Sequence, residues 1–464
     1  MSGGGSTGTP EPGGLRAALA GLTTRGRSFL AAGVAAAACA YLLGQADLLR
    51  VGLLLAALPL VCVLVLYRTR YRVAGSRTLA PARVPAAAEA RVRLRVENVA
   101  RLPTGVLMLQ DRVPYVLGPR PRFVLDRVEP GGHREVSYRV RSDLRGRYPL
   151  GPLQLRLSDP FGMCELTRSF STFDTLTVVP RVEPLPPVRL AGEAAGYGDG
   201  HRRSLALAGE DDIIPRGYRH GDDLRRVHWR STARHGELMV RREEQPQKTR
   251  CTVLLDTRAV AHEGTGPDSG FEWAVAGAAS VALHLLERGF SVRLLTDTGR
   301  TVPGPEGGGF AGAGEAADAG GLLLDALAVV EHSAEEGLAA AYDALRGGTE
   351  GLLVAFFGEL DEEQAALAGR IRRRSATAVA FVLDADAWSR GPGGIHLSRG
   401  GAPVGERLRM LREAGWTALP VAPGAALADL WRAADRAGAT PAATAGAAPG
   451  RSGDGGPGRN GGSA

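Results

Sequence analysis

The sequence CTVLLDTRAVAHEGTGPDSGFEWAVAGAASVALHLLERGFSVRLLTD, residues 251–297, decides the fold of the larger part of this chain. A buried strand that ends in an acid (Cys251–Thr257) is followed by a long helical run (Phe271–Gly289) and by a second strand (Phe290–Asp297). Strands that alternate with helices predict a mainly parallel sheet covered on both faces. In such sheets ligands bind at the carboxyl ends of the strands, which is where Asp256 lies.

The same alternation continues toward the C-terminus. After a Gly-rich loop come a helix, the strand GLLVAFFG, another helix, the strand ATAVAFVLD, a further helix and the strand TALPVAP. We therefore expect one α/β domain at residues 249–437. Residues 438–464 are rich in Ala, Gly and Pro and poor in large apolar side chains, which predicts a disordered tail.

Residues 73–190 carry a different pattern. The runs RVRLRVENV (91–99), REVSYRVRS (134–142) and LQLRLSD (153–159) alternate apolar and polar positions, as strands with one buried face do. Turn signals such as Pro130-Gly131-Gly132 separate them, and no long helical pattern intervenes. We expect a β-rich, sandwich-like domain or small barrel, with outward-facing arginines and no catalytic constellation.

Two nearly uninterrupted apolar runs, 29–44 and 51–67, precede the β-rich part. Each approaches the roughly 17 to 25 residues that cross a bilayer core. The short polar QADLLR between them suits a tight turn, so residues 28–67 are predicted to form a transmembrane hairpin after a disordered N-terminus (1–27). The alternative is a cleaved signal peptide, since Ala38-Cys39-Ala40 fits a small-x-small cleavage rule; the second apolar run favours a retained hairpin.

The charges around the hairpin predict its orientation. Arg16, Arg25 and Arg27 precede the first run, and Arg68, Arg70 and Arg72 follow the second. The turn between the runs holds only Arg50 and Asp47. Because positive charge stays on the cytoplasmic side, both ends of the hairpin are expected in the cytoplasm. The sequence thus indicates a multi-pass protein of the plasma (inner) membrane with cytoplasmic soluble domains.

Composition narrows the classes of partner. The chain has 56 Lys+Arg and 49 Asp+Glu residues, a net charge of +7, and acids are interspersed with the arginines. A nucleic-acid surface concentrates basic residues on one face, so we expect no nucleic-acid partner. The four cysteines are too few and too scattered for a disulfide framework or a zinc site.

The run YRHGDDLRRVHWRSTARHGEL (218–238) holds the densest chemistry in the chain. If Asp222 begins a helix, Arg226, Arg230 and Arg234 follow at four-residue steps and make one charged stripe. Arg225 and Trp229 have the same spacing, which lets a guanidinium lie against an indole. Gly236 would end that helix, and an extended strand would follow.

An enzyme is one interpretation of this run. His220, His228 and His235 with Asp222, Asp223 and Glu237 include the residue types that acid/base or metal-assisted hydrolysis uses. No two of these histidines have the i, i+4 separation of a helical metal motif, and there is no nucleophile elbow, Walker loop or HExxH. The interpretation we favour is an ion-pair network that locks two domains together or presents a docking surface.

The same run resembles a bacterial family, domain of unknown function 58. The residues that carry the resemblance are Arg216, Tyr218, Gly221, Asp222, Asp223, Arg225, Val227, Trp229, Ala233, Arg234 and Leu238. RGRYPLGPLQLRLSDPFGM (145–163) is similar to an upstream segment of that family. The chain departs from it at His228, where the family often has Asp.

The resemblance implies a membrane-anchored protein of unproven activity, commonly encoded beside a MoxR-type AAA+ ATPase and a transglutaminase-like protein, which are therefore the partners that we expect. It also implies a von Willebrand factor A-like C-terminal domain, placed at 249–437 behind a signature segment at 200–248. Such a domain with a working ion site has Asp-x-Ser-x-Ser, whose oxygens bind Mg²⁺. This chain reads Asp256-Thr257-Arg258-Ala259-Val260.

Arg258 replaces the first serine of that ion motif and would repel a divalent ion, so we expect it to pair with Asp256. Asp256 and Asp361 are the only metal ligands that we would name, and we expect no cofactor, with Mg²⁺ as the alternative. The leading hypothesis is a non-catalytic membrane adaptor. The alternatives are a membrane-bound hydrolase that uses residues 220–237 and a metal-dependent adhesion module.

Overall fold

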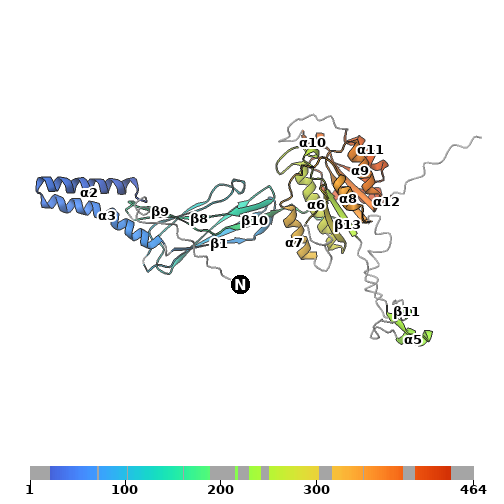
Figure 1. Ribbon diagram of the computed structural model, residues 1–464, viewed down its shortest axis with the longest axis horizontal. Helices are drawn as coiled ribbons and strands as arrows, with labels where there is room; N and C mark the ends of the chain where they lie inside the picture. Colours follow the sequence, from blue (N-terminus) through green and yellow to red (C-terminus); the bar gives the residue numbers. More distant parts are fainter. Residues whose placement is uncertain are drawn as a thin grey trace, which may run out of the picture.

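The structure is a computed structural model of the whole chain. It describes residues 21–70, 73–101, 103–159, 161–188, 215–217, 229–241, 250–302, 316–348, 350–389 and 403–439. These residues form a two-helix hairpin, a region of antiparallel sheets and an α/β region with a mostly parallel sheet (Figure 1). This order confirms the coarse architecture predicted from the sequence. The predicted C-terminal tail lies outside the described residues from residue 440 onward.

Two long helices form the hairpin, α2 (Thr24–Leu43) and α3 (Ala46–Arg70). The α2 helix begins ahead of the apolar run because the side chain of Thr23 accepts a hydrogen bond from the Gly26 amide. The helices approach closely: a Cβ atom on Gly33 would lie 2.5 Å from the Ala56 nitrogen. Both helices are long and apolar enough to cross a membrane.

The hairpin is continuous with the β region. On α3, the side chains of Cys62, Val63 and Leu66 are buried in the core of the β region, and Leu22, just before α2, joins the same core. The backbone before α2 also bonds to the turn ahead of β9, through Thr23 N to Met163 O at 2.9 Å. The anchor and the β region therefore share one core.

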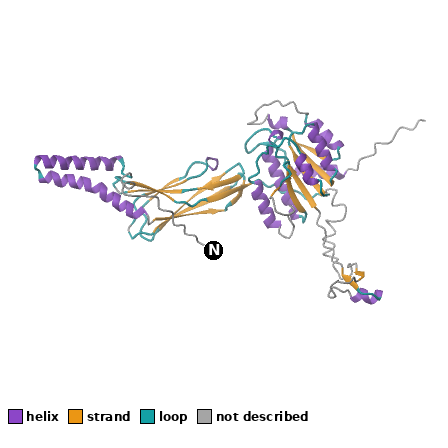
Figure 2. Cartoon of the chain, viewed as in Figure 1, coloured by secondary structure: helices purple, strands orange, loops and turns teal. Residues whose placement is uncertain are grey.

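Three small sheets make up the β region (Figure 2). Their orders are β1-β3-β6, β2-β10-β7 and β5-β4-β8-β9, and every pair is antiparallel except β2 with β10. The strands are β1 (Val73–Ala80), β2 (Arg83–Pro85), β3 (Glu89–Asn98), β4 (Leu107–Asp111), β5 (Arg122–Leu125), β6 (His133–Arg141), β7 (Gly146–Leu150), β8 (Leu153–Ser158), β9 (Glu165–Ser169) and β10 (Asp174–Val179), with the 3-10 turn η1 (Tyr115–Leu117).

One arginine of the β region does not follow the outward pattern that the sequence predicts. The Arg77 side chain is 1% exposed and donates from Nε and Nη2 to the two Asp111 carboxylate oxygens, at 3.0 and 2.6 Å. Tyr138 also donates to Asp111. Burial is the main cause that raises the pKa of the Tyr138 hydroxyl, and the Asp111 carboxylate raises it further. The expectation of solvated arginines is thus wrong for Arg77, because its charge is fully paired inside.

A six-stranded sheet forms the centre of the α/β region, in the order β15-β14-β13-β16-β17-β18. Its strands are β13 (Arg250–Leu255), β14 (Ser291–Thr296), β15 (Thr301–Val302), β16 (Glu350–Phe357), β17 (Ser375–Leu383) and β18 (Thr417–Val421), and only β15 is antiparallel to its neighbour. The helices are α6 (Gly270–Glu287), α7 (Ala316–Leu327), α8 (Ala339–Leu345), α9 (Glu362–Arg372), α10 (Ala385–Ser389), α11 (Val404–Glu413) and α12 (Leu427–Ala439), with the 3-10 turn η3 (Ala259–Ala261).

The sheet separates two apolar cores. One contains residues of α6, α7 and α12 and the other residues of α8, α9 and α11, so helices cover both faces as predicted. Leu185 and Val188, which the sequence places in the β-rich domain, belong to the first of these cores. Ser280 on α6 holds that segment by accepting a hydrogen bond from the Glu183 amide at 2.9 Å.

The part of the signature segment that the structure describes contains β11 (Pro215–Gly217), α5 (Trp229–His235) and β12 (Met239–Arg241). β11 and β12 pair antiparallel, with Arg216 opposite Val240. α5 ends before Gly236, whose φ of 75° lies in the left-handed region. The predicted helix end and the extended strand after it are both present.

Candidate functional site

The carboxyl ends of three neighbouring strands meet at one edge of the parallel sheet. Asp256 follows β13, Asp297 follows β14 and Gly358 follows β16. Because β13 lies between the other two strands, this edge is the point where the strand order reverses and where ligands bind in open α/β sheets. We call Asp256, Thr257, Arg258, Asp297 and Ser333 the carboxyl-edge cluster.

An ion pair fills the centre of this cluster. The Nε atom of Arg258 donates to Oδ1 of Asp256 at 2.9 Å, and its Nη2 atom donates to Oδ2 at 2.8 Å. Backbone amides of Arg258 and Gly358 add bonds to Oδ1 and Oδ2, at 3.2 and 3.1 Å. With side chains 3% and 0% exposed, the pair is closed off from water, as the sequence led us to expect of Arg258.

Two carbonyl oxygens complete the surroundings of Arg258. Its Nη1 atom donates to Glu336 O at 3.2 Å and its Nη2 atom to Glu359 O at 2.9 Å. Burial alone would lower the pKa of the guanidinium, but the hydrogen bonds and the charge of Asp256 outweigh burial, so the pKa is raised. Arg258 is therefore a permanent cation whose position three chain segments fix.

Asp297 is the acid that our sequence reasoning missed. It is fully buried and accepts from the Thr257 amide at 2.7 Å, the Thr257 hydroxyl at 2.5 Å and the Ser333 hydroxyl at 2.5 Å. The signal was present, since Asp297 ends the strand next to the one that precedes Asp256. Three donors hold the charge of Asp297, and the cluster is a closed network.

Two histidines and a phenylalanine connect this cluster to the β region. Nε2 of His262 lies 2.7 Å from the backbone oxygen of Asp256. The His262 ring lies 5.2 Å from that of Phe271, on which His332 stacks at 3.9 Å. Burial is the main cause that lowers the pKa of both His262 and His332, so both rings favour the neutral form.

Arg145 reaches this aromatic group from the β region. Its guanidinium lies 5.1 Å from the Phe271 ring centroid, pairs with Glu272 and donates from Nε to Leu327 O at 2.9 Å. The side chain is 6% exposed. An arginine of one region is thus buried in the other, and the RGRYPL motif in which it lies gave no sign of this role.

Both predicted metal ligands already accept hydrogen bonds within the protein. Both oxygens of Asp256 already accept from Arg258, and Asp361 caps α9 by accepting from the Gln364 amide at 2.7 Å. Within the described residues no group of three or more His, Cys, Asp or Glu side chains is placed to hold a metal. The residues present at the edge do not fit Mg²⁺, because a guanidinium takes the position of the cation.

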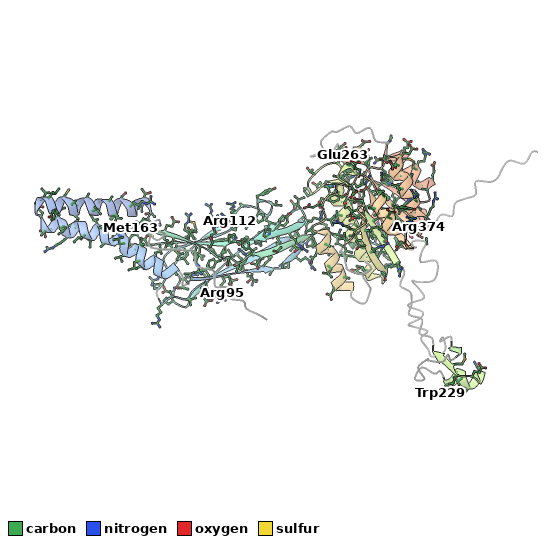
Figure 3. All side chains as sticks on the ribbon, in the orientation of Figure 1. Arg95, Arg112, Met163, Trp229, Glu263 and Arg374 are labelled. Carbon is green, nitrogen blue, oxygen red and sulfur yellow. The ribbon has the colours of Figure 1, made fainter. Side chains whose placement is uncertain are left out.

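The predicted signature residues are described only in part. Tyr218, Gly221, Asp222, Asp223 and Arg225 lie outside the described residues, as do His220 and His228. Trp229, labelled in Figure 3, begins α5 and is 71% exposed. Arg234 on the same helix is also exposed. Thr232 accepts from the Met239 amide at 3.0 Å and ties α5 to β12. The predicted ion-pair network remains a prediction.

The fold and this edge define a chain with a hairpin, antiparallel sheets and an α/β region whose ligand edge is closed by its own ion pair. The family described as "Protein of unknown function DUF58" matches residues 215–350, so the chain carries a DUF58 domain there, as the signature indicated. The match includes β11, α5, the Asp256–Arg258 pair and Asp297. A comparison with curated proteins finds no match.

Two of the solved structures that match this chain each cover less than a quarter of its length. A CARDB domain from Pyrococcus furiosus has 12% identity and a TM-score of 0.18, covering 23% of this chain and 87% of that chain. A putative cell-surface protein domain from Methanosarcina acetivorans has 14% identity and a TM-score of 0.15, covering 22% and 87%.

Proposed function

We propose that the protein is a non-catalytic, membrane-anchored adaptor that acts with a MoxR-type AAA+ ATPase. The observation that carries this proposal is the Arg258–Asp256 pair, which fills the edge where an α/β enzyme or an ion-dependent adhesion domain binds its ligand. A site closed by four hydrogen bonds to one carboxylate supplies rigidity in place of chemistry. The α/β region then serves as a folded platform of the von Willebrand A type.

The docking surface in this proposal is the signature segment. Trp229 exposes most of its indole on α5, and the exposed Arg234 lies five residues further along the same helix, about 140° around its axis. Tryptophan and arginine are the residue types enriched in binding hot spots, because both side chains bury large areas and the guanidinium of arginine also pairs with acids. The transglutaminase-like protein is the second partner that we propose.

The membrane anchor in this proposal is the α2–α3 hairpin. Its outer face carries exposed leucines and valines, such as Leu42 at 83% and Leu54 at 72% exposure, which only an apolar surrounding would cover. The soluble regions would stand on the cytoplasmic side, next to the arginines that flank the hairpin.

The test is recovery of partners from native membranes with the tagged full-length protein, with and without ATP, followed by mass spectrometry. We expect an AAA+ ATPase whose recovery depends on ATP, and loss of that ATPase with Trp229→Ala. The matched control is Tyr115→Ala, which removes an aromatic ring that is 91% exposed on the β region. An absence of any ATPase with the unsubstituted protein under both conditions would overturn the proposal.

A further inference from the structure

The exposed face of α3 extends along the β region. While Cys62, Val63 and Leu66 pack into the β core, Val61 and Leu64 on the same turns are 53% and 65% exposed. A helix with one face on a protein core and the other exposed and apolar lies at a boundary between protein and lipid. The apolar surface of the hairpin therefore continues to the level of β8 and β9, the strands that α3 contacts.

Three loops of the β region end at this same level. β3 ends at Asn98, which pairs with Val73 directly after α3; β4 begins at Leu107, opposite Leu157 near the end of β8. We call the turns that follow β3, precede β4 and connect β8 with β9 the hairpin end of the β region. Figure 3 labels Met163, in the third of these turns, beside the hairpin.

Each of the three turns presents an exposed apolar side chain. Val99 follows β3 and is 65% exposed, Val106 precedes β4 and is 52% exposed, and Phe161 in the β8–β9 turn is 59% exposed. Exposed apolar residues that gather at one end of a domain mark an interaction surface. Exposed arginines accompany them: Arg25 and Arg27 at the start of α2 and Arg101 after β3.

Hydrogen bonds hold these turns in place. Asp159 accepts from the amides of Phe161 at 3.0 Å and Cys164 at 2.6 Å, which fixes the turn that carries the phenylalanine. The Thr23 hydroxyl donates to Gly162 O at 2.7 Å and joins that turn to α2. Ser158 N bonds to Val106 O at 3.4 Å. The exposure of Phe161 is therefore built into a rigid turn.

We propose that Val99, Val106 and Phe161 rest in the headgroup layer of an anionic bilayer, so that the β region is seated directly on the membrane that the hairpin enters. The inference rests on the proposed membrane anchorage and adds a second, interfacial contact to it. Apolar side chains at this depth lose water, and the neighbouring arginines meet lipid phosphates. The β region then holds the α/β region at a fixed distance from the membrane.

The experiment uses the full-length protein in vesicles of phosphatidylglycerol and phosphatidylcholine, with and without lipids brominated along the acyl chain. A tryptophan probe replaces Phe161, Val106, Tyr115 or Cys39, one at a time, and the fluorescence of the unsubstituted protein is subtracted. The five native tryptophans all lie after residue 228. Tyr115, beyond the opposite end of β4, is the matched control, and Cys39 is an exposed position within α2.

We expect bromolipid to quench the probes in Phe161→Trp, Val106→Trp and Cys39→Trp and to leave Tyr115→Trp unchanged. If bromolipid quenches Cys39→Trp but neither Phe161→Trp nor Val106→Trp, the β region does not touch the bilayer, while the membrane anchor stands. That result would overturn this inference. If Cys39→Trp is not quenched either, the membrane anchorage itself is wrong, and this inference fails with it.

Discussion

Arg258 donates hydrogen bonds to both carboxylate oxygens of Asp256, two residues earlier in the chain, and neither side chain is accessible to water. The pair holds the turn after β13 in a single shape. It also places a fixed positive charge where the ion of a metal-dependent site would otherwise lie. The stability of the α/β region should depend strongly on it.

Substitution Arg258→Ala should destabilise the α/β region by about 3–5 kcal/mol, because it leaves the Asp256 carboxylate buried without a counter-charge. The measurement is urea denaturation of the detergent-solubilised full-length protein, monitored through tryptophan fluorescence. The tryptophans of the α/β region are Trp273, Trp388, Trp416 and Trp431. The control is Arg409→Ala, which breaks a pair with Glu413 whose side chains are 60% and 62% exposed, and which should cost about 0.5 kcal/mol or less. Equal effects of the two substitutions would contradict a buried pair.

Magnesium should not stabilise the unsubstituted protein. Each oxygen of Asp256 already has two donors, so a divalent ion would have to displace a guanidinium. Thermal unfolding with Mg²⁺, with Ca²⁺ at the same ionic strength, and with chelator should give the same midpoint. A saturable increase in that midpoint with Mg²⁺ alone would show that the edge binds a metal after all.

The free energy of unfolding should fall as the pH drops below about 6.5, the ordinary pKa of histidine. Burial lowers the pKa of His262 and His332 in the folded state, so the unfolded chain binds more protons below that pH. The charges that face these rings are Arg145, Asp256, Arg258 and Asp297. Each histidine contributes a slope of at most about 1.4 kcal/mol per pH unit.

Denaturation curves between pH 5 and 8 measure this dependence. His332→Gln should reduce the slope of the unfolding free energy against pH, by up to the contribution of one bound proton, because the residue that stacks on Phe271 no longer titrates. A profile unaffected by His332→Gln would mean that the ring does not stay neutral in the folded protein.

Removal of the Arg145 side chain should loosen the junction between the β and α/β regions. Arg145→Ala deletes the pair with Glu272, the contact with Phe271 and the bond to Leu327 O together. Spin labels at Tyr115 and Glu413, with Cys39 replaced, should show a broader distance distribution. Arg139→Ala, which removes a pair with Glu89 whose side chains are 67% and 54% exposed, should leave the distribution narrow.

Trp229→Ala should leave the free energy of unfolding within about 0.5 kcal/mol of the unsubstituted value, because most of the indole faces solvent. The same substitution should abolish recovery of the partner ATPase. Denaturation and partner recovery are measured on one preparation. A large loss of stability with unchanged binding would make Trp229 a structural anchor and would remove it from the docking surface.

The extent to which sequence predicts this molecule differs between its parts. Period-two and helical patterns predicted the β and α/β regions because they report which face of each element is buried. The hairpin was predicted from the length of two uninterrupted apolar runs. The Asp256–Arg258 pair was predictable because its members stand two residues apart and carry opposite charges. Asp361 precedes Gln364 by three residues, a capping pattern that could have identified the start of α9.

The contacts of Arg145 and Arg77 were not predictable in this way. Arg145 contacts residues 126 or more positions away, and Arg77 pairs with an acid on another strand, so both depend on how whole regions pack. An arginine in an alternating pattern is indistinguishable from its solvated neighbours until that packing is known. The packing of the segment around Leu185 was likewise not predictable, because nothing local shows which apolar surface it covers.

The shared core of the hairpin and the β region has a consequence for how the protein is made. Leu22 is synthesised before the first span, yet it is bridged next to Cys164, which leaves the ribosome more than a hundred residues later. In the proposed membrane anchorage, the hairpin inserts first, and the β region closes afterwards against helices that are already in the bilayer. A soluble fragment that starts at residue 73 would lack Leu22, Cys62, Val63 and Leu66, and the core of the β region that these side chains cover would be exposed to water.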